Sequence, residues 1–117
     1  TTGVDMYMGT GGAPEGVLAA GALRCVGGQL QGRLILDTEA KRERALKMGI
    51  KDPHKKYAMT ELASGDVIVC ATGVTDGALL KGVKFGKDVI ETETLIYRSV
   101  TGTVRRIQAE HREFSKF

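Results

Sequence analysis

The spacing of apolar and polar residues predicts strands and helices that alternate in the first half of the chain. Residues 4–8 are mostly apolar, which favours a short buried strand. Residues 14–26 are apolar on nearly every side, with Arg24 as the only charge after Glu15, and Pro14 suits the first helical turn. A helix of this kind is typically buried between two layers.

Strand patterns dominate the second half. Residues 66–71 are continuously apolar after Asp66, which predicts a strand buried on both faces. Residues 89–98 and 103–111 favour a strand pair joined by a tight turn. The shorter predicted elements are a strand at 29–36, an exposed helix at 38–49, a strand at 57–59, a helical turn at 61–64 and a helix at 78–81. Early alternation followed by strand pairing predicts an α/β unit, a layered sandwich with a mixed sheet.

Composition narrows the classes of protein that fit this pattern. The chain has 117 residues and a formal charge of +3, a mild balance without the basic stripe of a nucleic-acid-binding domain. No apolar stretch approaches the ~18 residues that a membrane span needs. Cys25 and Cys70 lie in apolar segments and are predicted to be buried and reduced, as in a cytoplasmic protein. Because the chain opens on a predicted strand without Met, we expect it to be a piece of a longer protein.

The segment GTGGAPEGV, residues 9–17, joins the first predicted strand to the first helix. Free N–H groups and the helix dipole favour an anion at such a helix start, and glycines let a ligand approach the backbone closely. The segment has no GK[ST] sequence and therefore does not match a phosphate-binding P-loop. Pro14 and Glu15 also interrupt a dinucleotide-binding fingerprint.

Two interpretations of Glu15 remain open from spacing alone. A carboxylate in the first helical turn stabilises a helix by ~0.3–1 kcal/mol through the dipole. Alternatively, Glu15 binds a hard cation such as Mg²⁺ or Mn²⁺, which would offset its repulsion of a phosphate at the same corner. The dipole role is the more frequent one for a glutamate at this position.

A second strand end carries polar residues that could face the same cleft, namely Thr72, Thr75 and Asp76. The simpler interpretation is that residues 75–77 form a turn. The other polar candidates are His54 and His111, which lack metal-ligand spacing and are expected at the surface, and Arg105 and Arg106, which either touch phosphate or flank a sheet edge as solvated charges.

Three segments together resemble one family. They are GVDMYMGTGGAPEGVLAAGALRCVGGQLQGRL, ATGVTDGALLKGV and TETLIYRSVTGTVRRIQAEH, and they are similar to the C-terminal part of class II fructose-1,6-bisphosphatase of the GlpX type. The resemblance implies a lithium-sensitive sugar phosphatase, a layered α/β/α/β/α sandwich that uses Mg²⁺ or Mn²⁺. It also implies hydrolysis of the 1-phosphate of fructose 1,6-bisphosphate in gluconeogenesis, and in some members action on sedoheptulose 1,7-bisphosphate.

The resemblance assigns roles to two residues of the glycine-rich segment. Glu15 corresponds to a metal ligand and Gly12 to a glycine that lies against the substrate, while Thr10 departs mildly from the family's aliphatic residue. The family's other acidic ligands, and the residues that activate water, belong to its N-terminal part. We therefore expect residues 1–117 to be the C-terminal α/β portion of an oligomeric cytoplasmic enzyme, inactive alone.

Alternatives from other classes are a non-catalytic module that binds phosphate or its missing partner, and a portion of a related inositol phosphatase. Nucleic-acid binding rests only on the charge of +3 and on Arg105 and Arg106, and is disfavoured because the chain has no Trp and few aromatic residues.

Overall fold

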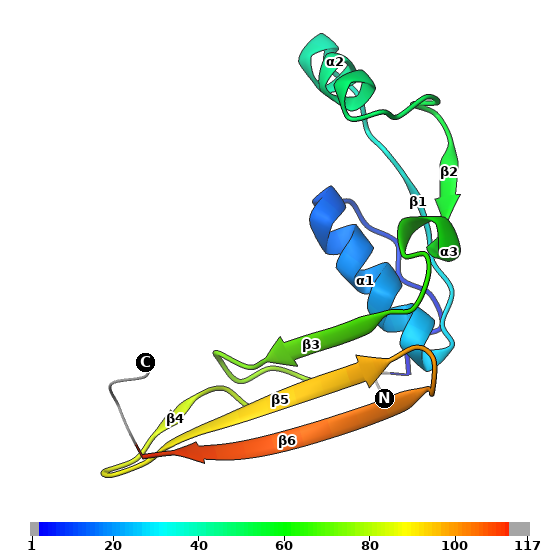
Figure 1. Ribbon diagram of the computed structural model, residues 1–117. Coiled ribbons are helices and arrows are strands. Elements are labelled where there is room, and N and C mark those ends of the chain that lie inside the picture. The colour runs from blue at the N-terminus through cyan, green and yellow to red at the C-terminus, as the bar shows by residue number, and fades with distance from the viewer. Residues whose placement is uncertain (1–2, 113–117) are drawn as a thin grey trace.

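The computed structural model describes residues 3–112 of the chain, and within them three helices and six strands form. Figure 1 shows two parts, a twisted sheet with α1 above it and an arm that carries α2 at its tip. The elements are α1 (Ala13–Val26), β1 (Gln31–Arg33), α2 (Glu39–Lys47), β2 (Lys56–Ala58), α3 (Met59–Leu62), β3 (Ile68–Thr72), β4 (Lys84–Phe85), β5 (Ile90–Arg98) and β6 (Thr103–His111).

The predicted α1 is confirmed, with one residue added at its start. Gly12 precedes the helix in an extended conformation and Pro14 lies in the first turn. The helix ends because Gly27 adopts the left-handed conformation, with φ of 80°, in which its N–H reaches the Leu23 carbonyl. Glycine tolerates this φ without the Cβ clash that other residues suffer.

The four-stranded sheet has β5 at its centre. One edge of β5 pairs with β6 along its whole length, and the other pairs with β3 and then β4. The predicted pair of long strands is therefore confirmed. The presence of both helices and strands confirms the α/β class. All strand pairings within residues 3–112 are antiparallel, so the prediction of a mixed sheet is wrong for this part of the chain.

The core lies between α1 and one face of the sheet. A Cβ on Gly21 would lie 3.3 Å from the side chains of Val67 and Val69, so the absent side chain lets the helix approach β3 closely. Few hydrophobic residues are buried: Ala20 and Cys25 of α1, Ile90 and Leu95 of β5, and, separately, Ala45 of α2 in the arm. Cys25 is buried as predicted, whereas Cys70 is exposed and that prediction is wrong.

Several burial predictions fail for one common reason. Residues 4–8 are extended but exposed and unpaired within residues 3–112, α1 is covered on one side only, and Ile68 of β3 is largely exposed. Each of these segments has an apolar sequence, but the second covering layer does not come from residues 3–112. The predicted burial between layers therefore does not occur in this structure.

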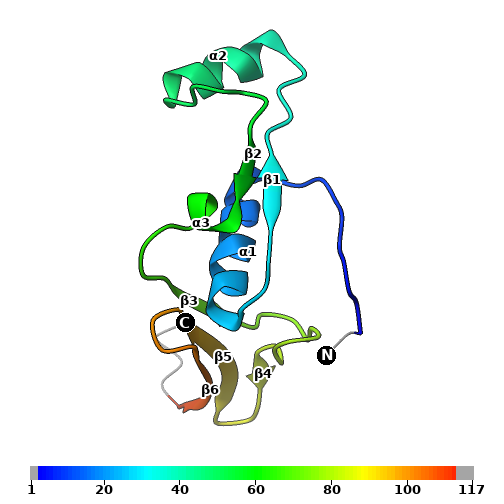
Figure 2. The same cartoon turned by 90° about the vertical axis from the view of Figure 1, so that its right-hand side faces the viewer.

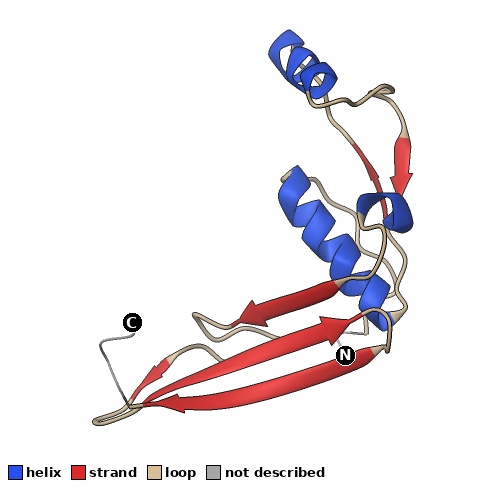
Figure 3. Cartoon of the chain, in the orientation of Figure 1, coloured by secondary structure: helices blue, strands red, loops and turns tan. Residues whose placement is uncertain are grey.

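The shorter elements agree with the sequence to different degrees. The strand predicted at 29–36 shrinks to β1, and the strand predicted at 57–59 is shifted by one residue to β2. These two strands pair with each other to form the base of the arm (Figure 3). The exposed helix is α2, and the Thr38 hydroxyl accepts a hydrogen bond of 3.3 Å from the Lys41 N–H at its start. The helical turn is α3, whereas the helix predicted at 78–81 is wrong because the chain bends there to close a loop.

Candidate functional site

The glycine-rich corner forms the predicted junction of an extended segment with a helix start. Gly12 is the residue before the first helical turn, and its carbonyl accepts a hydrogen bond of 3.1 Å from the Gly16 N–H. No side chain caps this end of α1. The first-turn N–H groups therefore remain available to an acceptor from outside the helix.

Glu15 is exposed in the first turn of α1, and within residues 3–112 no ion pair or hydrogen bond engages its side chain. A Cβ built on Gly12 would meet the Glu15 carboxylate, so this carboxylate lies directly against the Gly12 backbone. The two residues that the resemblance singled out are therefore neighbours in space. Their contact is compatible with both interpretations of Glu15.

The backbone of Gly12 is not in the left-handed region. Its φ is −67° and its ψ is 144°, values that any L-residue adopts, so a side chain there would cause no backbone strain. A larger residue at Gly12 would instead displace the Glu15 side chain. A left-handed turn therefore does not explain the glycine, and its missing side chain leaves room for the Glu15 carboxylate.

The second strand end does not join this corner. The Asp76 carboxylate accepts a hydrogen bond of 2.8 Å from the Gly82 N–H, and Thr72 hydrogen-bonds to Thr94 across the sheet. Figures 1 and 2 both place the start of α1 well away from the loop that follows β3. The turn interpretation is therefore favoured for Asp76, and a cleft shared with Glu15 does not form within residues 3–112.

The buried charged residue of the sheet escaped sequence analysis. Glu93 is 5% exposed, and its carboxylate accepts hydrogen bonds from Arg106 and from the Lys81 N–H at 3.1 Å. The hydrogen bond from the Arg106 guanidinium, more than any other contact, lowers the pKa of Glu93. The alternation of β5 places Glu93 on the same face as buried Leu95, and this was the signal available in the sequence.

The Arg106 side chain is half exposed, as expected of a solvated charge, but it is also a structural partner of Glu93. Its guanidinium donates to Glu93 and, at 2.9 Å, to the Leu79 carbonyl. The Gly73 N–H donates to the Glu93 carbonyl, so the loop 73–83 is held at its start, its tip and its return. Arg105 is exposed, as predicted.

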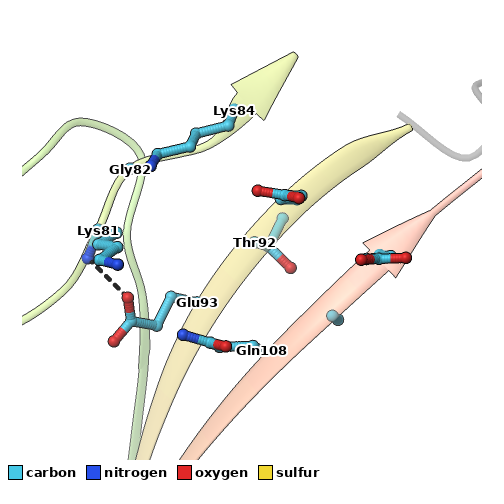
Figure 4. Close-up of a pocket in the computed structure, with 9 residues that line it drawn as sticks. Lys81, Gly82, Lys84, Thr92, Glu93 and Gln108 are labelled. Atoms are coloured by element: carbon cyan, nitrogen blue, oxygen red, sulfur yellow. Dashed lines mark hydrogen bonds between the residues drawn. The ribbon is translucent and has the colours of Figure 1, made fainter. Parts of the chain in front are cut away.

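A groove of about 410 Å³ lies beside this pair, between the loop and the sheet. Figure 4 shows Lys81 and Lys84 on one side of it, and Glu93, Thr92 and Gln108 on the strands opposite. Glu91 and Glu110 also line it, so charges of both signs are present and no one class of ligand is favoured.

The histidines do not form a site. His54 is exposed, as predicted, and its N–H donates a hydrogen bond to the Asp52 carboxylate. His111 is half-buried at the end of β6, where its ring hydrogen-bonds to Thr92 at 3.2 Å. Within the described part of the chain, no group of three His, Cys, Asp or Glu residues could hold a metal ion, and no helix is long and apolar enough to cross a membrane.

Comparisons with known proteins place this geometry in a family. The model of the bacterial fructose-1,6-bisphosphatase family, glpX-encoded, matches residues 1–111. Two proteins of Synechococcus sp., strains JA-3-3Ab and JA-2-3B'a(2-13), are 44% and 46% identical over 123 aligned positions, which cover 94% of this chain. A protein of Gloeobacter violaceus is 43% identical over the same share.

All three relatives are named D-fructose 1,6-bisphosphatase class 2/sedoheptulose 1,7-bisphosphatase. The chain spans only 35–36% of their length. The family match includes the glycine-rich corner, the loop after β3 and the β5–β6 pair. The chain therefore belongs to the family of glpX-encoded bacterial fructose-1,6-bisphosphatases.

Proposed function

We propose that residues 1–117 are the C-terminal portion of a class 2 fructose-1,6-bisphosphatase with the lithium-sensitive sugar phosphatase fold. The observation that carries the proposal is the family match over residues 1–111, which contains both Gly12 and Glu15. The short span of the relatives that the chain covers supports its being one part of a longer polypeptide. The small core of the described residues is consistent with that organisation.

In the whole protein, the proposed reaction is hydrolysis of the 1-phosphate of fructose 1,6-bisphosphate to fructose 6-phosphate and phosphate, in gluconeogenesis. Sedoheptulose 1,7-bisphosphate is a second candidate substrate because the relatives' names include it. We place this enzyme in the cytoplasm as a homo-oligomer.

Glu15 is proposed as one carboxylate ligand of Mn²⁺ or Mg²⁺. Its exposure and lack of a partner within residues 3–112 leave both oxygens available, which fits a hard cation. Within the described residues no group of three potential ligands forms, so we expect further ligands to come from outside them. The bound metal would supply charge stabilisation to the phosphoryl group.

Gly12 is proposed to lie against the substrate. Its missing side chain and the uncapped first turn of α1 allow a phosphate or sugar oxygen to approach the backbone N–H groups. A carboxylate and a phosphate repel each other at one helix start unless a cation lies between them. Glu15 beside Gly12 therefore supports a metal-bridged substrate and not a phosphate bound to the helix alone.

The test compares the chain with a complete enzyme. We expect the purified 117-residue chain to release no phosphate from fructose 1,6-bisphosphate with Mn²⁺ or Mg²⁺, because one carboxylate cannot form a multi-metal site. We expect activity from a chimera in which this chain replaces the region that it matches in the Synechococcus sp. (strain JA-3-3Ab) protein. A folded chimera that lacks metal-dependent bisphosphatase activity would refute the proposal.

A further inference from the structure

The chain exposes more surface than a compact protein of its size. Its accessible surface is 9398 Å², whereas a folded monomer of 12.5 kDa has about 6,200 Å². Its radius of gyration is 18.0 Å, against about 13 Å for a compact domain of this length. About 3,000 Å² of surface is therefore in excess, an amount within the range of an obligate interface.

Residues 4–8 form the most exposed apolar segment of this surface. Met6, Tyr7 and Met8 are 76%, 89% and 84% exposed. The segment is extended, and no backbone hydrogen bond engages it within residues 3–112. Because successive side chains of a strand point to opposite sides, apolar residues at consecutive positions indicate a strand meant to be covered on both faces.

The position of the segment supports the same interpretation. Figures 1 and 2 show the segment that precedes α1 rising toward the start of that helix, in the same direction as β1. In Figure 2 the segment is set apart from α1, on the far side of β1. An extended segment, a helix and a returning strand form the start of a β–α–β unit. What the unit lacks, within residues 3–112, is a strand beside residues 4–8.

We propose that residues 4–8 are a sheet strand whose pairing strand belongs to the class 2 bisphosphatase polypeptide outside the region that this chain matches. About two thirds of each relative lies outside that region, and in one polypeptide such a strand is held at a high effective concentration. The assignment of the pairing strand to this polypeptide rests on the proposed function. Because the segment leads directly into Gly12 and Glu15, its pairing also orders the proposed metal corner.

Hydrogen exchange of the backbone amides tests the proposal. In the 117-residue chain, the amides of residues 4–8 should exchange at nearly the rate of an unfolded peptide. In the chimera they should exchange at least ~100-fold more slowly, as amides in paired strands do. The exposed helix α2 is the internal control, and its exchange should be alike in both proteins.

Met6→Pro and Met6→Ile sharpen the test in the chimera. Proline removes the N–H and should abolish the protection of residues 4–8, whereas isoleucine keeps a strand-forming apolar residue and should preserve it. If the chimera fails to fold, the intact Synechococcus protein supplies the measurement at the segment aligned with residues 4–8. Rapid exchange there, or in a folded chimera, overturns the proposal.

Two further outcomes separate this proposal from the proposed function. Slow exchange at residues 4–8 in an inactive chimera supports the strand pairing and refutes the proposed function. Bisphosphatase activity with rapid exchange at residues 4–8 supports the proposed function and refutes the strand pairing. Protection in the 117-residue chain alone, together with a dimeric mass by light scattering, would make a second copy the occupant and overturn our choice.

Discussion

The carboxylates of Glu93 and Glu15 differ in burial and in hydrogen bonding. Glu93 is buried and accepts hydrogen bonds from Arg106 and Lys81, both within the chain. Glu15 is exposed and, among residues 3–112, has no partner beyond its contact with Gly12. The Glu93 carboxylate stabilises the fold through these hydrogen bonds, whereas the Glu15 carboxylate is available to bind a ligand.

The difference separates a region whose buried polar side chains find partners within residues 3–112 from a region whose polar groups do not. In the described residues no buried side-chain nitrogen or oxygen lacks a hydrogen-bond partner, and the buried Glu93 of the sheet accepts from Arg106 and Lys81. The corner instead combines helix-start N–H groups, an extended segment and a carboxylate that have no hydrogen-bond partner among residues 3–112. We expect substitutions in the sheet to change stability, and those at the corner to change activity.

The largest expected effect is that of Glu15→Gln in the chimera. If Glu15 binds the metal, kcat should fall at least ~10²-fold, since the amide removes the charge that a hard cation needs. Elevated Mn²⁺ should restore part of the rate, and Tm should stay unchanged or rise as repulsion between carboxylates is relieved. The measurement is kcat against Mn²⁺ concentration, with melting curves beside it.

Glu39→Gln is the matched control because Glu39 lies in the first turn of α2, at a comparable helix position. It should leave kcat unchanged. If Glu15→Gln behaves like Glu39→Gln in both assays, Glu15 serves only the helix dipole.

Gly12→Val should have the next largest effect. The new side chain displaces the Glu15 carboxylate without straining the backbone, so kcat/KM should fall by about 10- to 100-fold with little change in Tm. Steady-state kinetics and thermal unfolding of the chimera measure the two effects. Gly11→Val is the control, since a Cβ there meets no described atom within 4 Å. Unaltered kinetics with a much lower Tm would mean that Gly12 serves only folding.

Glu93→Gln should act on stability and on its pH dependence. The lowered pKa of Glu93 means that its ionised form stabilises the folded state at pH values above its unfolded pKa of about 4.3. That contribution is lost as the pH falls through the lower folded pKa. At pH 7 the variant chimera should therefore have a lower Tm than the parent.

The difference between Glu93→Gln and the parent should shrink as the pH falls below about 4.3. Glu91→Gln, an exposed neighbour on β5, should show neither effect. An equal Tm loss for both variants at every pH would argue against a role for the Glu93–Arg106 pair.

The smallest effect is expected for Asp76→Ala. The alanine leaves the buried Gly82 N–H without its acceptor, which should cost about 1 kcal/mol of stability. Asp76→Asn keeps an acceptor oxygen and should recover most of this loss. Activity of the chimera should stay within about twofold for both variants. A large loss of kcat in Asp76→Asn would mean that Asp76 belongs to the catalytic site after all.

Sequence patterns predicted α1, α2 and the β5–β6 pair because these depend on local signals. Pro14 and Gly27 bound α1, Thr38 begins α2, and alternation marks the long strands. Patterns failed at residues 4–8 and at Ile68, where burial depends on a covering layer that residues 3–112 do not contain. They also missed the role of Glu93, because a charge on an alternating strand does not reveal its partner.

The sequence by itself determined the family, the order of the main elements and the junction of glycines and Glu15 at a helix start, since motif and periodicity are local properties of the chain. Tertiary structure alone decided that Arg106 reaches Glu93 and Leu79, and that the start of α1 lies apart from the loop that follows β3. The register of β5 with β6 and the return of the loop 73–83 bring together residues far apart in sequence, and spacing along the chain cannot report such distances.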